Sequence, residues 1–211
     1  MNPVEYQGAH LVFVEAFTAR PSEEKVGNYW QDDDAAPVKA AIKTHYIAEQ
    51  DFTCCYCRKQ VLQANHDVWD AEHIIPKDDH PQFMFEPLNL AISCGPCNEA
   101  KGSQNVLKNK SRKTFPKKSA DYIIVHPHFD DYEEHILWWG HVVAPNGSDK
   151  GQKTIEMCKL LRFAAKHGKF NSDLLGSGYR EGVGKLMQTR DLTDSEAIRA
   201  SLDVLLRRLP G

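Results

Sequence analysis

The sequence lacks any long apolar run. None of its 211 residues belongs to a stretch of about 18 consecutive apolar side chains, which a membrane-spanning helix needs. The N-terminal stretch MNPVEYQGAHLVFVEAF carries acids where a secretory signal would carry basic residues. Internal repeats and low-complexity segments are also absent. We therefore expect a cytoplasmic protein, long enough for one fair-sized domain or for a small domain with helical elaborations around it.

Acidic residues are missing from one particular stretch. Residues 1–100 carry 7 Lys and Arg against 16 Asp and Glu, whereas the remainder carries 19 against 13. Between Lys101 and Lys118 there are seven basic residues and no acid. Such a run is often only a solvated face, and the alternative is a strip that contacts nucleic-acid phosphates. The candidate phosphate contacts are Lys101, Lys108, Lys110, Arg112 and Lys113.

Four of the six cysteines form two C-x-x-C pairs, Cys54 with Cys57 and Cys94 with Cys97. Disulfides are disfavoured in a reducing cytoplasm, so paired motifs of this kind favour a metal. Each pair can supply two thiolates from one tight turn. Together they predict a closed, tetrahedral, structural Zn²⁺ site with no open coordination position.

Other uses of the cysteines remain open. A single C-x-x-C can be a redox pair, although the presence of two pairs favours zinc. Cys55 could replace Cys54 as a ligand, with only one residue left before Cys57. Cys158 lies in a helical pattern and is expected to be a buried core thiol. The 36 residues between Cys57 and Cys94 exceed the usual zinc-ribbon gap, so a substantial segment is inserted there.

The organisation along the chain predicts an α+β protein. We divide it into an N-terminal segment with an acidic linker (1–36), a core with the cysteine pairs (37–118), and a C-terminal region (119–211). The patterns predict a helix over 37–50, strands over 68–76 and 87–93, and a helix from 97. Further on they predict a strand over 121–127, a helix over 149–168 and a last helix from 193.

The inserted segment contains a histidine directly after a carboxylate, in WDAEHIIPKDD. The blocks EHIIPKD, LNL and CGPCNEAKG match, in order and with compatible gaps, the three signature blocks of the HNH endonucleases, whose fold is called ββα-metal. The sequence resembles that family over about residues 51–110. The third signature position, which is His or Asn in the family, is Asn98 here. The resemblance thus describes an H-N-N variant.

The resemblance implies a role for each matched residue. His73 would be the general base, Glu72 and Asn98 would be ligands of one catalytic Mg²⁺ or Mn²⁺, and Asn89 would fix the loop and orient the histidine. The substrate would be DNA, with RNA not excluded. Adjacent strand residues face opposite sides, so the backbone must bend near Pro76 or the site must straddle the strand edge. Asp70 is the alternative ligand on the face of Glu72.

The whole chain further resembles the nuclease subunits of Septu-type or retron-associated anti-phage systems, which implies an ATPase protein partner. A different reading is a zinc module that binds nucleic acid or protein without cutting. A second polar group, HPHFDDYEEH, could be another metal site, but we expect a polar turn with capping acids. Its residues are His126, His128, Asp130, Asp131 and His135.

Overall fold

The structure is a computed structural model that describes residues 1–163 apart from residues 64 and 140. It is a mixed α+β structure with small antiparallel sheets, as the sequence predicts. No helix among these residues is both long and apolar enough to cross a bilayer. The α-helices are α1 (Gly8–Thr18), α2 (Ala36–Glu49), α3 (Gly95–Lys101) and α4 (Asp149–Met157), and the strands are β1 (Trp69–His73), β2 (Leu90–Cys94), β3 (Ile136–Trp139) and β4 (Val142–Pro145). Short 3-10 helices are η1 (Ser22–Glu24), η2 (Gly27–Gln31), η3 (Asp33–Ala35), η4 (His66–Val68), η5 (Pro81–Phe83), η6 (Pro87–Asn89) and η7 (Ser119–Asp121).

Contacts divide the chain into two compact units. The first comprises Met1–Tyr122 and His126–Phe129, and the second comprises Ile123–Val125 and the chain from Asp130 onward. Among the described residues, each unit contains one two-stranded sheet, β1 with β2 in the first and β3 with β4 in the second. The candidate catalytic residues and the four candidate cysteine ligands named above all lie in the first unit.

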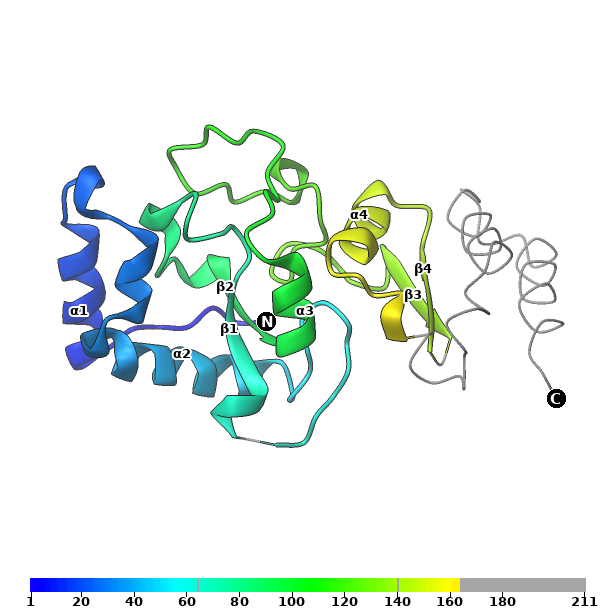
Figure 1. Cartoon of the computed structure of the whole chain (residues 1–211), viewed down its shortest axis with the longest axis horizontal. Helices are drawn as coiled ribbons and strands as arrows, with labels where there is room; N and C mark the ends of the chain where they lie inside the picture. The colour runs from blue at the N-terminus through cyan, green and yellow to red at the C-terminus, as the bar shows by residue number, and fades with distance from the viewer. Residues whose placement is uncertain (64, 140, 164–211) are drawn as a thin grey trace, which may run out of the picture. The chain divides into compact units, whose positions relative to one another are not determined.

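The first unit is organised around the β1–β2 hairpin. The strands pair antiparallel from Trp69 opposite Cys94 to His73 opposite Leu90. Residues 90–93 of β2 are all buried, because helices α2 and α3 each contact both strands. Residues 74–89, with η5 and η6, connect β1 to β2, and helix α3 begins directly after β2 (Figure 1).

Helix α2 forms where the sequence predicts it. Its proline lies in the first turn, where the missing backbone N–H costs nothing. The side chains of Val38, Ile42 and Tyr46 recur every four residues and are buried. The Tyr46 hydroxyl donates to the Pro87 carbonyl at 2.6 Å and accepts from the Val4 N–H at 3.1 Å. The helix therefore fixes both the extreme N-terminal segment and the loop that precedes β2.

The acidic stretch over 20–36 is more ordered than the linker that we expected. It forms η1, η2 and η3, and Trp30 is only 9% exposed. The Tyr29 ring lies 4.8 Å from that of Phe17 in α1, and Phe17 lies 5.0 Å from Phe85. Tyr29 and Trp30 thus pack this acid-rich stretch against the rest of the unit, which its overall composition does not predict.

The strand expected over 121–127 is absent. This stretch makes a single isolated bridge, between Leu107 and Tyr122. Its polar groups are satisfied differently, since the Tyr122 hydroxyl donates to the Pro116 carbonyl and the Val125 N–H donates to the Thr154 hydroxyl. The apolar residues of this stretch indicate that it is buried, and a packed loop can bury them as well as a strand can.

The second unit contains a hairpin that the sequence patterns did not predict, β3 with β4. Helix α4 is the start of the helix expected over 149–168, and Ser148 caps it by accepting from the Gly151 N–H at 3.2 Å. Residues 164–168 and the helix expected from 193 lie outside the described residues.

Gly151 permits a close approach of α4 to the residue before β3. A Cβ atom at this position would lie 1.9 Å from the His135 carbonyl oxygen, which is part of the backbone and moves only with the hairpin. Glycine to alanine in a helix interior otherwise gains about 1 kcal/mol. We expect Gly151→Ala to lower the free energy of unfolding by about 1–3 kcal/mol, because the overpacking outweighs that gain. Urea unfolding measures it, with exposed Lys153→Ala as control, and an unchanged stability would contradict the packing.

Candidate metal centre and active site

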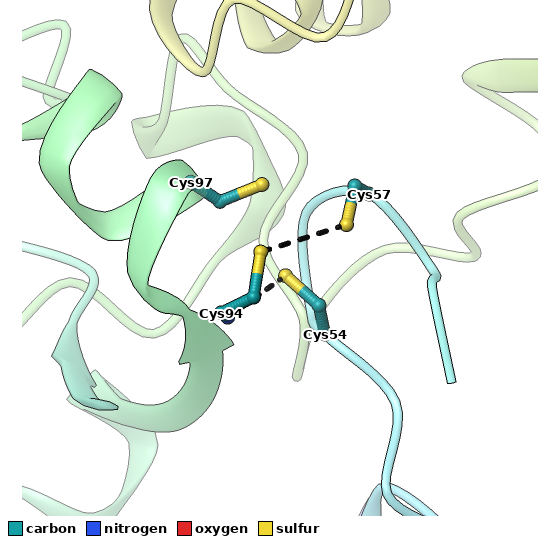
Figure 2. A group of neighbouring side chains, drawn as sticks. All are labelled: Cys54, Cys57, Cys94 and Cys97. Atoms are coloured by element: carbon teal, nitrogen blue, oxygen red, sulfur yellow. Dashed lines mark hydrogen bonds between the residues drawn. The ribbon is translucent and has the colours of Figure 1, made fainter. Parts of the chain in front are cut away.

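The four predicted cysteines form one cluster. The sulfurs of Cys54, Cys57, Cys94 and Cys97 all lie within 4.8 Å of one another. Figure 2 shows the two side chains of each pair directed toward those of the other pair. The Cys57 and Cys94 sulfurs are 3.8 Å apart. A tetrahedral site with zinc–sulfur bonds of about 2.3 Å has sulfur–sulfur edges of about 3.8 Å. The cluster can therefore bind zinc.

Local backbone geometry selects these four sulfurs. The Arg58 N–H donates to the Cys54 carbonyl at 3.0 Å, and Arg58 has a left-handed φ of 56°, which closes the first turn. The Cys94 N–H donates to the Cys54 sulfur at 3.3 Å, a bond that favours a thiolate. Cys55 does not belong to the cluster, and its N–H donates to the Ile92 carbonyl. Cys158 is fully buried, as expected of a core thiol.

A cavity of about 710 Å³ lies in the same unit. Asp70, Glu72 and His73 from β1 line it, and so does Asn98 from α3. Glu72 and His73 share the cavity although they are neighbours in the chain, because His73 is the last residue of β1. Three side chains with oxygen donors and one imidazole are thereby brought to one space.

The His73 ring is held in one tautomer. Its Nε2 lies 3.1 Å from the Met84 carbonyl oxygen, and because a carbonyl only accepts, Nε2 carries the hydrogen. Nδ1 then has the lone pair. The side chain is mostly buried, and the edge of the Trp30 ring system packs against it with 4.4 Å between centroids. Burial, together with the Lys101 and Lys77 charges, lowers the pKa of His73 to about 3, so the ring is neutral at pH 7.

Asn89 is fully buried and acts on the backbone around the histidine. Its Oδ1 accepts from the Ile75 N–H at 2.7 Å, while its Nδ2 donates to the carbonyls of Ile75 and Phe83 at 3.1 and 3.0 Å. These bonds join the chain leaving β1 to the turn that ends beside Met84. Asn89 thus positions the carbonyl that holds the His73 ring, with no hydrogen bond to the ring itself among the described contacts.

Glu72 is 1% exposed and ion-paired. The Lys101 ammonium lies 2.5 Å from Glu72 Oε1, and the Tyr56 hydroxyl donates to the same oxygen at 2.9 Å. Burial raises the pKa of the Glu72 carboxyl, and Lys101 and Tyr56 offset part of that rise. Lys101 also donates to the His73 carbonyl at 2.7 Å. This lysine fixes the end of β1 and is only 2% exposed, so the phosphate role that we expected for it is not available in this arrangement.

Asp70 and Asn98 form a second, more accessible pair. Asn98 Nδ2 donates to Asp70 Oδ2 at 3.0 Å, and both residues are half-buried. Since a carboxylate only accepts, it draws the amide nitrogen toward itself and leaves Asn98 Oδ1 for another partner. Asp70 also shares a strand face with Glu72. The alternative ligand and the expected amide ligand are therefore in contact.

The remaining basic-strip residues lie away from the cavity lining. Lys108, Lys110 and Lys113 are exposed, and Arg112 pairs with Asp121 at 2.6 Å. None of these four basic residues lines the cavity.

The second polar group is divided between the two units. His126 and His128 belong to the first, whereas Asp130 and His135 belong to the second. His128 Nε2 bonds the Leu90 carbonyl at 2.8 Å, and His135 Nδ1 lies 2.5 Å from the Ser148 hydroxyl. Among the described residues, the four cysteines are the one group of three or more His, Cys, Asp or Glu side chains close enough to share a metal ion.

Sequence patterns missed several residues of the site. Trp30 contacts the His73 ring, Tyr56 binds Glu72, and Lys39 and Lys43 line the cavity from α2. The spacing of the two lysines, four residues apart in a predicted helix, was the available signal, since it places them on one face.

The comparisons with known proteins add one relative. No family model matches the chain. Over 161 residues, 76% of its length, the chain is 26% identical to the Septu protein PtuB of Bacillus thuringiensis. The match spans 56% of that protein, little more than half of it. The chain is thus distantly similar to a Septu component over most of its own length.

The cysteine cluster yields a test of metal binding. We expect Cys97→Ser to lose bound zinc and to unfold at a much lower temperature, because three thiolates and a hydroxyl hold zinc poorly and metal binding contributes folding free energy. Elemental analysis and thermal unfolding measure the two effects. Cys158→Ser is the matched control and should retain one zinc per chain. Full zinc content in Cys97→Ser would exclude the four-thiolate site.

The buried ion pair yields a second test. Lys101→Met leaves the Glu72 carboxyl without its ammonium partner, and we expect it to lower the free energy of unfolding by about 3–5 kcal/mol. The double variant Lys101→Met/Glu72→Gln removes both charges and should recover much of that loss. Chemical denaturation of the two variants measures the difference, and equal losses would show that Glu72 is not what Lys101 compensates.

Proposed function

We propose that the chain is a metal-dependent endonuclease of the HNH type, with β1, β2 and α3 as its ββα-metal core. The observation that carries the proposal is the His73 ring, held in one tautomer by the Met84 carbonyl, in the same cavity as Asp70, Glu72 and Asn98. Phosphodiester hydrolysis needs a proton acceptor for water and stabilisation of the charge that develops on the phosphate.

The oxygen donors in the cavity fit a hard divalent cation. Glu72 and Asn98 would hold Mg²⁺ or Mn²⁺, and Asp70 is placed to join them, because these ions prefer carboxylate and amide oxygens. When bound, such an ion stabilises negative charge on the phosphate and on the leaving oxygen. Both described bonds to the Glu72 carboxylate go to Oε1. Lys101 and Tyr56 therefore orient Glu72 while Oε2 remains for a cation.

His73 would take the proton from the attacking water. Its Nδ1 is the nitrogen with the lone pair, while its Nε2 hydrogen stays with the Met84 carbonyl. The Trp30 contact and the loop tied by Asn89 keep the ring in place before substrate arrives. A base fixed in advance costs no reorganisation during the reaction.

Zinc would act structurally in this enzyme. The four clustered sulfurs would complete a tetrahedral ligand set around it and leave no position for water. Cys97 immediately precedes Asn98, so the zinc would hold the turn of α3 that presents the amide ligand.

The biological setting that we propose is anti-phage defence. The similarity to the Septu protein PtuB supports such a role, and the resemblance of the chain to Septu-type nuclease subunits supports action on DNA together with an ATPase partner in the cytoplasm. RNA is the other substrate that the same chemistry serves, because the attack occurs at a phosphodiester in both.

Plasmid cleavage tests the nuclease directly. With Mg²⁺ or Mn²⁺, and with the co-expressed ATPase partner present, we expect His73→Ala to lower the cleavage rate of supercoiled plasmid by about 100-fold or more, because it removes the proton acceptor. Its zinc content should stay at that of the unmodified protein, while loss of the buried ring that packs against Trp30 should lower its unfolding temperature, so cleavage is compared at a temperature at which the variant is folded.

His66→Ala is the matched control, because His66 lines the same cavity and bonds only the exposed Thr44 hydroxyl through its ring in the described contacts. It should cleave normally. Equal cleavage by the His73→Ala variant would remove the histidine from the mechanism. Intact plasmid with every protein would instead favour a zinc module that binds without cutting.

A further inference from the structure

We infer that Lys39 and Lys43 of α2 form the phosphate-binding wall of the cavity and hold the nucleic-acid strand beside the candidate catalytic residues. The inference rests on the proposed function and names a substrate contact for the same site. It assigns this task to a helix that precedes the strand–strand–helix core, and not to the basic stretch that follows it.

Helix α2 presents two different faces. Val38, Ile42 and Tyr46 are buried in the core of the unit. The cavity is lined instead by Ala36, Lys39, Ala40 and Lys43, in which small side chains alternate with lysines. The alanines leave room beside the helix, and the lysines supply positive charge along it. This face is therefore built to accept an extended anion.

The charged residues of the cavity lining divide into ion-paired residues and residues without an ion pair among the described contacts. Four lysines and four acids line it, and four of these residues form two ion pairs, the buried pair of Lys101 with Glu72 at 2.5 Å and the more exposed pair of Lys77 with Asp78 at 2.9 Å. Lys39 and Lys43 remain on the α2 wall, while Asp70 and Glu99 remain on the walls from β1 and α3. In the described part of the chain, no carboxylate forms an ion pair with either α2 lysine.

Backbone carbonyls hold both ammonium groups. Lys39 Nζ donates to the Trp30 carbonyl and Lys43 Nζ donates to the His66 carbonyl, each at 2.9 Å. Such a bond uses one of the three ammonium hydrogens and cancels none of the charge. It also restricts a flexible side chain before the substrate binds, which reduces the entropy lost on binding. Each lysine thus keeps two donors and a full charge for a phosphate.

The positions of the lysines match a nucleic-acid strand. Four helical residues advance about 6 Å along the axis. Two nucleotide steps of a stacked strand advance about 6.8 Å, so the lysines can contact different phosphates of one strand. Lys39 also bonds Trp30, whose ring contacts His73. The phosphate held by α2 would consequently lie close to the proposed base.

Salt dependence of binding tests this assignment. All variants are made in the His73→Ala chain without added divalent metal, so that binding is measured without cleavage. Binding of single- and double-stranded oligonucleotides is followed from low to moderate salt. Compared with the parent, we expect Lys39→Gln/Lys43→Gln to reduce the slope of log affinity against log salt by about 1.4 for a single strand and about 1.8 for a duplex, corresponding to two lost phosphate contacts.

Lys153→Gln/Lys159→Gln is the matched comparison, because it removes the same charge from exposed positions off the cavity and outside the basic stretch. Its slope should stay at the parent value. An unchanged slope for the α2 variant overturns the inference, as does failure of the parent to bind either oligonucleotide at low salt. A loss of slope confined to the α2 variant supports it even if the unmodified chain proves not to cut, so the two proposals fail separately.

Discussion

The gathering of four sulfurs around one point is the constraint on which the rest of the first unit depends. It joins the turn after α2 to the junction of β2 and α3, two parts of the chain about 40 residues apart. A hairpin and a two-turn helix bury little apolar surface, whereas a structural zinc supplies on the order of 10 kcal/mol of folding free energy. The cluster also reaches the cavity at two points. Cys97 precedes Asn98, and Tyr56 lies within the first cysteine pair and binds Glu72.

Around that constraint, the cavity separates charges that are neutralised from charges that remain available. The buried Glu72 carboxylate is stabilised by its ion pair with Lys101 and by the hydrogen bond from Tyr56. Asp70 and Asn98 are more accessible and already in contact. The lysines of α2 provide charge of the opposite sign on another wall. The cavity thus presents oxygen atoms on the walls from β1 and α3 and ammonium groups on the wall from α2.

The sequence predicted the elements whose patterns are local. Helix α2, strands β1 and β2 and the start of α3 follow from apolar periodicity, and the union of two C-x-x-C pairs follows from ligand chemistry. Burial was harder to predict. Lys101 belongs by sequence to a basic run, yet its ammonium is inside the protein, because only the fold places it beside Glu72. The apolar run over 121–127 is equally compatible with a strand and with a packed loop. Trp30 was hidden by its acidic neighbours.

The contact between Trp30 and His73 bears on how far the unit could be divided. The ring that closes one side of the imidazole comes from η2, outside the stretch of 37–118 that carries the recognisable motifs. A fragment limited to residues 37–118 would lack Trp30. The His73 imidazole would then be exposed to water on that side, and Lys39 would lose the carbonyl to which it donates. A protein into which this fragment was inserted would have to supply an aromatic side chain in place of Trp30. A boundary drawn at residue 37 from the motifs alone would therefore leave out a residue that packs against His73.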